Sequence, residues 1–287
     1  MWPRRWPCEV SGDVKHRLIK PTMTGYPVGL LDLEDQPSIF VNGTLGEMPG
    51  VAVVGTRKCT RYGIDLAEAF GHAIARAGWT TVSGLARGID AAAHRGCLRG
   101  DGHAVAVLGS GIDVCYPKEN QPILDEILAV GGAVVSEYPP GTPPDRWRFP
   151  ARNRIIAAAS SAVVVVEAAR KGGALITARL GAEMGRPVFV VPGDVDRPAS
   201  EGCNLLIRDG AHPVMGKTDL IEELSLILGP PDNDLAEVGE SGLPPGGVVF
   251  DQLADHWSVT MSEALVRVGK LQLEGRVRRQ GEMIVPT

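Results

Sequence analysis

Short runs of apolar residues alternate with amphipathic stretches along most of the chain. Val51–Val54 is a continuous apolar run that ends at Gly55, and apolar side chains then recur at spacings of three and four from Ala67 to Ala77. An uninterrupted apolar run is typical of a strand buried on both faces, whereas the longer spacing is typical of one helix face. This stretch therefore predicts a strand, a turn and a helix that ends at Gly78.

The same unit recurs down to about residue 228. A short strand at Ser38–Val41, closed by an Asn-Gly turn, precedes the regular pattern. Strands that are apolar on both faces and alternate with helices predict an α/β fold, with a parallel sheet covered by helices on both faces. The other predicted strands lie at 80–84, 104–109, 133–137, 162–167 and 187–193, and the other helices start near Ala91 or lie at Ile123–Leu128, Arg154–Ala159, Leu175–Met184 and Leu220–Leu228.

Small or polar residues mark the carboxyl ends of the predicted strands. Ligands of parallel α/β sheets bind beyond this edge, so we expect the functional residues to gather there. The end residues are Gly55, Ser83 with Gly84, Gly109, Glu137, Glu167 and Gly193.

The pattern divides the chain into four parts. Residues 1–25 are predicted to form an irregular N-terminal segment, and residues 26–228 the main domain. Residues 229–247, rich in proline, glycine and acids, are typical of a linker that does not pack. Residues 248–287 combine a helix at Ser262–Leu273 with the hairpin-like RVRRQGEMIVP, which predicts a small winged-helix-like domain. Only two helices are clear in it.

The charged residues are unevenly distributed along the chain, so the net charge alone does not describe its surface. The formal net charge is −5, which by itself argues against a nucleic-acid partner. Residues 218–247, however, hold seven acids and no lysine or arginine, so the rest of the chain sums to +2. A local basic surface is therefore compatible with the composition.

The cysteines and the start of the chain restrict the class of protein. The five cysteines form no CxxC pair and no metal-like spacing with histidine, so neither a metal site nor a disulfide framework is expected. No run of about 18 apolar residues occurs, and the basic start lacks the apolar core of a signal peptide. We expect a soluble, cytoplasmic protein with reduced thiols and no membrane contact.

The first candidate binding segment is GTRKCTRYG, which carries Arg57, Lys58 and Arg61 after the strand end at Gly55. A glycine there lets a phosphate approach, and the next helix offers unpaired N–H groups and its positive dipole end. Arg57 adds a planar fork that suits phosphate. An ordinary strand-to-helix turn with surface cations explains the same residues.

The second segment is SGLARGIDAAAH, which follows the next strand. Gly84 and Gly88 permit close approach of a ligand, and Ser83 offers a hydroxyl without a GxSxG elbow or an obvious base. Asp90 fits the N-cap of the following helix, so we interpret it as structural. His94, one turn into that helix, is interpreted as a packing residue.

The third segment, DRWRFPARNRIIAAAS, interleaves aromatic and basic residues. Four arginines and one acid lie between Asp145 and Arg154, with Trp147 and Phe149 among them. Cations along a backbone and aromatic faces for bases are what single-stranded nucleic acid binding needs. In the alternative, the aromatic side chains are anchored in the core and the arginines are solvated.

The fourth segment, EAARKGGALITARLGAE, places Lys171 just before a Gly-Gly pair and a predicted helix start. Such a helix N-terminus is receptive to anions. Glu183, further along, can be interpreted as a general base or as a solvent-facing acid.

As a set these segments resemble the bacterial DNA-processing protein A (DprA/Smf) family. LGSGIDVCYP, SEYPPGTPP, GGALITARLGAEMGRPVFVVPG and GCNLLIRDGA join them in the family's order and spacing, over about residues 26–228. The resemblance implies an extended Rossmann-like domain that binds single-stranded DNA, forms a homodimer and loads the RecA recombinase in natural transformation. Relatives also carry an N-terminal helical domain, which the irregular start of this chain does not match.

The resemblance also implies a set of DNA-binding residues. They come from the GxR turn, the SGxAxG loop and the FPxRNR segment, and Lys171 is added from the residues alone. The expected set is Arg57, Ser83, Gly84, Gly88, Phe149, Arg152, Asn153, Arg154 and Lys171.

Three functions compete at this point. The leading hypothesis is a binding protein without catalytic residues or cofactors, because no convergent nucleophile and base, metal cluster or P-loop occurs. The alternative is a nucleotide-processing enzyme of the Lonely Guy phosphoribohydrolase type, with Glu183 as its base, although GGALIT lacks the intact PGGxGT loop. A purely structural oligomerisation module would leave the arginine-aromatic segment unexplained.

Overall fold

The computed structural model describes residues 16–46, 49–231, 243, 247–257 and 260–287. These belong to two compact units, Met1–Pro231 and Asp232–Thr287. Each unit has its own hydrophobic core.

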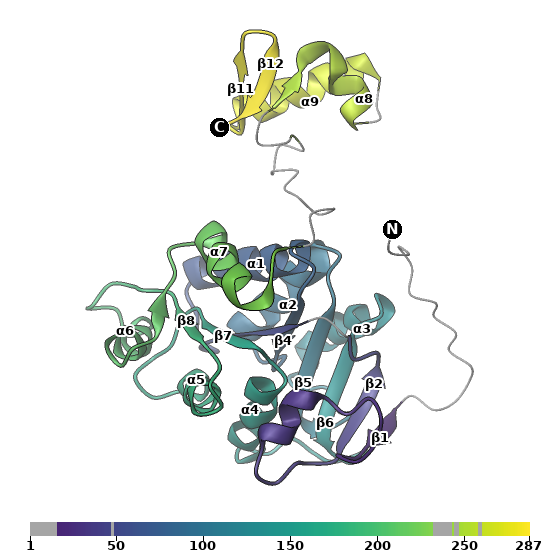
Figure 1. Ribbon diagram of the computed structural model, residues 1–287, viewed down its shortest axis with the longest axis vertical. Helices are drawn as coiled ribbons and strands as arrows, with labels where there is room; N and C mark the ends of the chain where they lie inside the picture. Colours follow the sequence, from purple (N-terminus) through teal and green to yellow (C-terminus); the bar gives the residue numbers. More distant parts are fainter. Residues whose placement is uncertain (1–15, 47–48, 232–242, 244–246, 258–259) are drawn as a thin grey trace. The chain divides into compact units, whose positions relative to one another are not determined.

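The first unit is built on a sheet that has nine strands among the described residues (Figure 1). The strands from β3 to β9 run parallel, which confirms the predicted parallel sheet. β2 pairs antiparallel with β6, and β1 pairs antiparallel with β2. In sheet order the strands are β1 (Arg17–Ile19), β2 (Ile39–Gly43), β6 (Ala133–Tyr138), β5 (Ala104–Gly111), β4 (Thr80–Ser83), β3 (Gly50–Val54), β7 (Ala162–Val165), β8 (Val188–Val190) and β9 (His212–Pro213).

Strand β3 is where the chain changes its direction across the sheet. The chain first moves from β3 through β4 and β5 to β6, and then returns to the other side of β3 to form β7, β8 and β9. The loops after β3 and β7 therefore diverge at neighbouring carboxyl ends. Such a switch point is the usual place for a ligand crevice in open α/β sheets.

Helices cover both faces of the sheet, as predicted. On one face lie α1 (Arg61–Arg76), α2 (Ile89–Arg99), α3 (Gln121–Ala129) and α7 (Lys217–Leu228), which pack over two apolar clusters. On the other face lie the 3-10 helix η1 (Val28–Asp32) and the helices α4 (Arg148–Ala158), α5 (Gly173–Glu183) and α6 (Glu201–Arg208). Figure 1 shows the two layers on either side of the strands.

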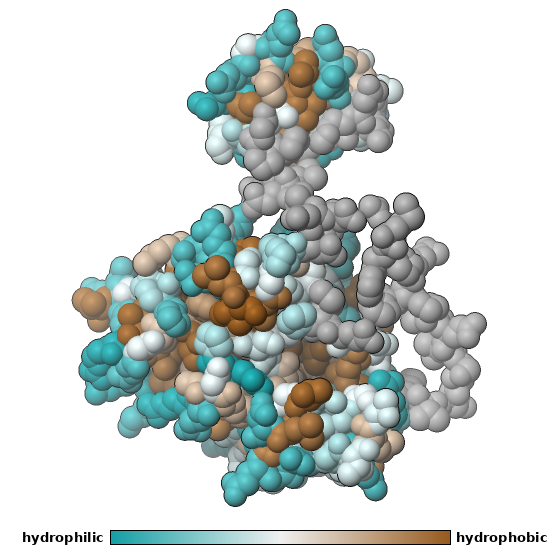
Figure 2. All heavy atoms as spheres, viewed as in Figure 1, coloured by the Kyte–Doolittle hydropathy of each residue, from teal (hydrophilic) through white to brown (hydrophobic). Residues whose placement is uncertain are grey.

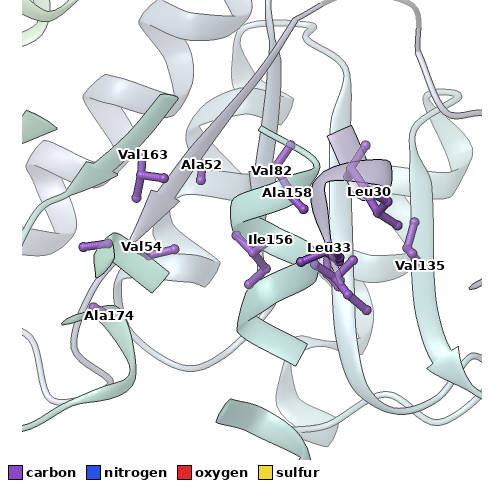
Figure 3. Close-up of a cluster of buried hydrophobic side chains, with 14 of the residues drawn as sticks. Leu30, Leu33, Ala52, Val54, Val82, Val135, Ile156, Ala158, Val163 and Ala174 are labelled. Carbon is purple, nitrogen blue, oxygen red and sulfur yellow. The ribbon is translucent and has the colours of Figure 1, made fainter. Parts of the chain in front are cut away.

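Helix α4 is anchored to the sheet by a third apolar cluster (Figure 3). Its side chains Ile156 and Ala158 are at most 1% exposed and lie between the strands and Leu30 and Leu33 of the η1 region. Val54, at the end of β3, belongs to the same cluster. This packing holds the start of α4 beside the carboxyl ends of the central strands.

The surface of the first unit is mainly polar on the side drawn in Figure 2. Apolar side chains gather there over α7 and over η1, where Leu226 and Val28 are exposed. Within the described part of the chain, no helix has the length and apolar character to cross a bilayer.

The N-terminal expectation needs a correction. Residues 1–25 were expected to be irregular, but Arg17–Ile19 form the edge strand β1, in register with Ile39–Val41 of β2. Ile19 is buried in the core, so the sheet begins before residue 26. The strand is too short for a periodic pattern, and its pairing partner lies twenty residues away in the sequence.

The second unit has the order expected of a small winged-helix-like domain. It contains β10 (Val248–Val249), the 3-10 helix η4 (Phe250–Gln252), α8 (Leu253–Trp257), α9 (Met261–Leu273), β11 (Val277–Gln280) and β12 (Met283–Pro286). The predicted wing is the β11–β12 hairpin, and Thr260 and Glu263 form a capping box at the start of α9. Most of the predicted linker, 229–247, lies outside the described residues.

Candidate nucleic-acid interface

A cavity of about 540 Å³ opens at the carboxyl ends of β3 and β7. It lies between the loop after β3, the start of α4 and the start of α5, at the switch point of the sheet. Exposed cations form its rim, and aromatic and buried polar side chains form its wall and floor. The lining includes Arg57, Lys58, Asp90, Tyr116, Arg146, Phe149, Arg152, Asn153, Lys171 and Gly173.

The loop after β3 is held in place by the end of β7. The N–H of Thr56 donates to the Glu167 carbonyl at 2.7 Å, and the Glu167 carboxylate accepts both the N–H and the hydroxyl of Thr60. Thr60 in turn caps α1. Gly88 has a φ of +79°, and a Cβ on it would lie 2.5 Å from the Thr56 carbonyl oxygen. Glycine is therefore required for the loop that carries Arg57 to pack here.

The three cations of this segment lie in two different places. Arg57 and Lys58 are exposed and line the cavity. Arg61 lies on the first turn of α1, where it forms an exposed pair with Asp65 four residues along at 2.9 Å. Two of the three cations thus belong to the cavity rim.

Phe149 forms an aromatic wall of the cavity. The Arg57 guanidinium carbon lies 4.8 Å from the centre of its ring, and the Tyr116 ring lies 5.5 Å away at a tilt of 31°. A Cβ at Gly109 would approach the Phe149 ring to 2.8 Å, so only glycine leaves room for it. Cation and aromatic faces therefore lie together at the mouth of the cavity.

Arg152 forms the floor and is only 3% exposed. Its Nη1 donates to the carbonyl oxygens of Gly84, at 2.7 Å, and of Val107, and its Nε donates to Asn153 Oδ1 at 3.2 Å. Burial lowers the pKa of Arg152 to about 10, against the attraction of Asp90, so the side chain stays charged at neutral pH. Arg152 thus links the ends of β4 and β5 beneath the cavity.

The start of α5 supplies the opposite wall. Asn153 Nδ2 donates to the Gly173 carbonyl at 3.0 Å, which ties α4 to α5. The N-cap residue Gly172 has no side chain to satisfy the first N–H groups of α5. Lys171 is exposed beside them, so a positive dipole end and a cation share this wall.

Four of the expected DNA-binding residues lie elsewhere than in the cavity lining. Ser83 is fully buried and its hydroxyl donates to the Val53 carbonyl at 2.7 Å. Gly84 lies under Arg152, and Gly88 supports the Arg57 loop. Arg154 pairs with Glu137 and with Asp35, the latter at 2.8 Å, on the η1 side of α4. These residues support the site or lie apart from it.

The arginine-aromatic segment is the start of α4 and not a loop. Of its four arginines, Arg146 lies on the rim and Arg152 on the floor. Arg148 stacks 5.0 Å from Trp147 and 5.1 Å from Tyr138, and donates to the Pro143 carbonyl. Neither it nor Trp147 lines the cavity, so Phe149 is the aromatic residue of the segment that does.

Sequence reasoning missed part of the lining. Asp90 was expected to be the N-cap of α2, but Gly88 takes that position and Asp90 falls in the first turn, 6% exposed and facing the cavity. Tyr116 had no signal beyond its motif, LGSGIDVCYP. Arg146 could have been chosen, because it is the arginine of its segment that precedes the helix.

The Lonely Guy alternative finds no support in the position of Glu183. This residue is the last of α5, exposed, and ten residues beyond Gly173 at the cavity. The rise of an α-helix places it about 15 Å away. Among the described residues no group of three or more His, Cys, Asp and Glu side chains could hold a metal ion.

His94, expected to be a packing residue, is fully buried behind this site. Burial lowers its pKa to about 4. Because the unfolded chain binds the proton near pH 6.5 and the folded chain does not, stability should fall as the pH drops from 6.5 towards 4, by about 3 kcal/mol in all. Urea unfolding at pH 7 and at about pH 4.5 measures this loss.

The loss should be reduced by about 2–3 kcal/mol in His94→Gln relative to wild type. His212→Gln, at an exposed histidine, serves as the control and should keep the wild-type pH dependence. If His94→Gln loses as much stability as wild type over this range, His94 is not the group responsible.

Comparison with known proteins identifies the family. The family model for DNA recombination-mediator protein A matches residues 17–225. Protein Smf of Synechocystis sp. is 42% identical over 218 residues, which cover 74% of this chain and 54% of Smf. This chain thus spans about half the length of that relative.

Two solved structures resemble the first unit. DNA processing protein A (DprA) from Streptococcus pneumoniae matches with a TM-score of 0.68 and 40% identity, over 73% of this chain and 74% of that one. DNA processing protein A from Helicobacter pylori, solved for its single-stranded DNA binding mode, matches with a TM-score of 0.66 and 28% identity, over 73% and 95%. Because the matched residues include every strand from β1 to β9, the chain belongs to the DNA recombination-mediator protein A family, whose curated members are named DprA and Smf.

Proposed function

We propose that the protein binds single-stranded DNA in the cavity at the switch point and acts without catalysis of its own. The observation that carries this proposal is the composition of the rim. Arg57, Lys58, Arg146 and Lys171 surround a cavity whose wall is Phe149. Cations that follow a phosphate backbone and an aromatic face for a base are the two elements of sequence-tolerant single-strand binding.

The geometry also suits a single strand better than a duplex. A base that is to lie against Phe149 must leave its stack, which costs several kcal/mol in a duplex and little in a single strand. The uncapped start of α5 offers N–H groups to a phosphate beside Lys171. The relative from Helicobacter pylori, solved for its single-stranded DNA binding mode, supports the same assignment.

We prefer a binding function to an enzymatic one because the candidate catalytic side chains are hydrogen-bonded within the fold, buried, or far from the cavity. The Ser83 hydroxyl is buried on a carbonyl, His94 is buried, and Glu183 is exposed at the far end of α5. Asp90 is the acid that lines the cavity, and no nucleophile lies in hydrogen-bond contact with it among the described residues. A nucleotide-processing activity would need such a pair.

The biological role that we infer is protection of incoming DNA and loading of RecA in transformation and recombination, by a homodimer. It rests on membership of a recombination-mediator family. The test is RecA filament formation on single-stranded DNA coated with single-strand-binding protein. Addition of this protein should shorten the lag of RecA-dependent ATP hydrolysis. An unchanged lag with a strand that the protein binds would contradict the loading role and leave DNA binding in place.

Replacing Phe149 by Ala should weaken binding of an unstructured oligonucleotide by about 1–3 kcal/mol, because the stacking face is lost. Trp147→Ala is the matched control, since Trp147 is an exposed aromatic residue of the same segment but does not line the cavity. Fluorescence anisotropy of labelled oligo-dT measures both. Equal affinities for Phe149→Ala and wild type, with both folded by circular dichroism, would remove Phe149 from the interface.

A further inference from the structure

One acid lies on the floor of a cavity whose rim is cationic. Asp90 is the second residue of α2, is 6% exposed and lines the cavity. A site that bound only phosphates would be weakened by a carboxylate, since like charges repel. The acid therefore indicates that part of the ligand which reaches the floor is a hydrogen-bond donor.

The contacts of Asp90 leave acceptor positions open. Its Oδ2 accepts the Ala86 N–H at a long 3.4 Å, and the nearby Gly84 N–H also favours its charged form. An ionised carboxylate has about four acceptor positions. Within the described residues, no side chain donates a hydrogen bond to it. Unfilled acceptor positions of a buried carboxylate are costly unless a ligand supplies donors.

Arg152 does not close this site. Its hydrogen bonds go to the Gly84 and Val107 carbonyls and to Asn153. Its charge, and that of Arg57, lowers the pKa of Asp90 through space, but burial is the larger effect and raises that pKa. The arginines thus offset only part of the cost of burying the Asp90 charge, and neither of them donates a hydrogen bond to its oxygens among the described residues.

The donor that fits must be planar, neutral and attached to a phosphate. Planarity follows from Phe149 and Tyr116 on the wall, and attachment to a phosphate follows from the cations of the rim. A nucleobase meets these conditions, and a cavity of about 540 Å³ is within the range that holds a ligand of this size.

Guanine is the base whose Watson–Crick edge matches a carboxylate. It presents N1–H and the 2-amino group side by side, so two parallel N–H···O bonds can form with the two oxygens. Thymine offers one N–H between two carbonyl oxygens, which would face the carboxylate. Adenine and cytosine offer an amino group next to an unprotonated ring nitrogen, which repels the second oxygen.

We propose that the cavity holds one guanine base of the bound strand, with the Asp90 carboxylate accepting its N1–H and 2-amino group and Phe149 against its face. This inference rests on the proposed single-stranded DNA binding and adds a base preference to it. The cations of the rim contact the DNA backbone whatever the base sequence, whereas Asp90 recognises the base at one position.

The test varies the base before it varies the protein. Fluorescence anisotropy is measured with labelled oligonucleotides of equal length that alternate thymine with guanine, inosine, adenine or 7-deazaguanine. Wild type should bind the guanine strand about tenfold more tightly than the adenine strand. Inosine lacks the 2-amino group and should lose most of that gain. 7-Deazaguanine keeps the Watson–Crick edge and should retain it.

The protein-side variant is Asp90→Asn, with Asp125→Asn on the exposed face of α3 as the control. Asp90→Asn should bind the guanine and inosine strands alike, because its amide presents one acceptor and one donor. Asp125→Asn should keep the wild-type preference. If Asp90→Asn does not fold, the inosine and 7-deazaguanine strands on wild type still decide the question.

The possible negative results separate a failure of this inference from a failure of the proposed function. Equal affinity of wild type for the guanine, inosine and adenine strands, with each strand bound, would overturn the guanine reading and leave the proposed function intact. A guanine preference that survives in Asp90→Asn would overturn the role of Asp90. Failure to bind any of the strands would overturn the proposed function and this inference together.

Discussion

Replacing Arg152 by Met should lower the free energy of unfolding of the first unit by about 3–5 kcal/mol. The guanidinium is buried and donates to the Gly84 and Val107 carbonyls and to Asn153. Its loss leaves these acceptors without a donor and Asp90 without its main opposite charge. Because a domain of this kind has a total stability of about 5–15 kcal/mol, this loss is a substantial fraction of the total.

Urea unfolding followed by circular dichroism measures this effect, with Arg146→Met as the matched control. Arg146 lines the same cavity but is exposed, so its replacement should change stability by about 0.5 kcal/mol or less. A loss of less than about 1 kcal/mol in Arg152→Met would show that the buried network does not hold the ends of β4 and β5 together.

Replacing Arg57 by Gln should weaken single-stranded DNA binding by about 10- to 100-fold. A charge-assisted hydrogen bond to a phosphate is worth about 1.5–3 kcal/mol, and the cation that lies over Phe149 is lost with it. The slope of log K against log salt should flatten by about 0.7, because one fewer phosphate is neutralised. Anisotropy of labelled oligo-dT at several salt concentrations measures both quantities.

Arg61→Gln is the control for Arg57→Gln. It removes the same charge four residues away, but from a side chain that pairs with Asp65 on α1 and does not line the cavity. It should leave the affinity within about threefold of wild type and the salt slope unchanged. Equal losses in the two variants would mean that only net charge matters and that Arg57 makes no specific contact.

The arrangement of the sheet could be predicted because most of the central strands are short apolar runs, as in β3 and β7, and are followed by a small or polar residue. Gly55 and Glu167 mark the ends of β3 and β7, and the cavity opens there. Of the two antiparallel strands, β2 corresponds to the strand predicted at Ser38–Val41, whereas β1 was missed. Arg17–Ile19 has three residues, and its pairing with β2 depends on contacts distant in sequence.

Which arginines of α4 face the cavity could not be predicted from the local sequence alone. The helix was predicted to begin near Arg154, but α4 begins at Arg148, and Pro150 lies in its first turn, where proline is tolerated. In a helix, residues 152 and 154 are about 200° apart, so Arg152 and Arg154 cannot face one cavity. Which of them faces it depends on Glu137 of β6 and Asp35 after η1, which pair with Arg154.

Asp90 and Ser83 were misplaced for a related reason. Both are polar residues beside a glycine-rich loop, where capping or exposure is the usual expectation. Gly88, with its positive φ, is the N-cap, so α2 starts one residue before Asp90, and Asp90 lies in the first turn among the residues that line the cavity. Ser83 is the last residue of β4 and bonds across to β3, so its hydroxyl is covered by the sheet.

The central claim is tested most directly by anisotropy titrations of the wild-type chain with labelled oligo-dT and with a matched duplex, each at two salt concentrations. We expect tighter binding of the single strand, with a log–log salt slope of about −3 if Arg57, Lys58, Arg146 and Lys171 each contact a phosphate. No binding of the single strand, or equal binding of the duplex, would contradict it.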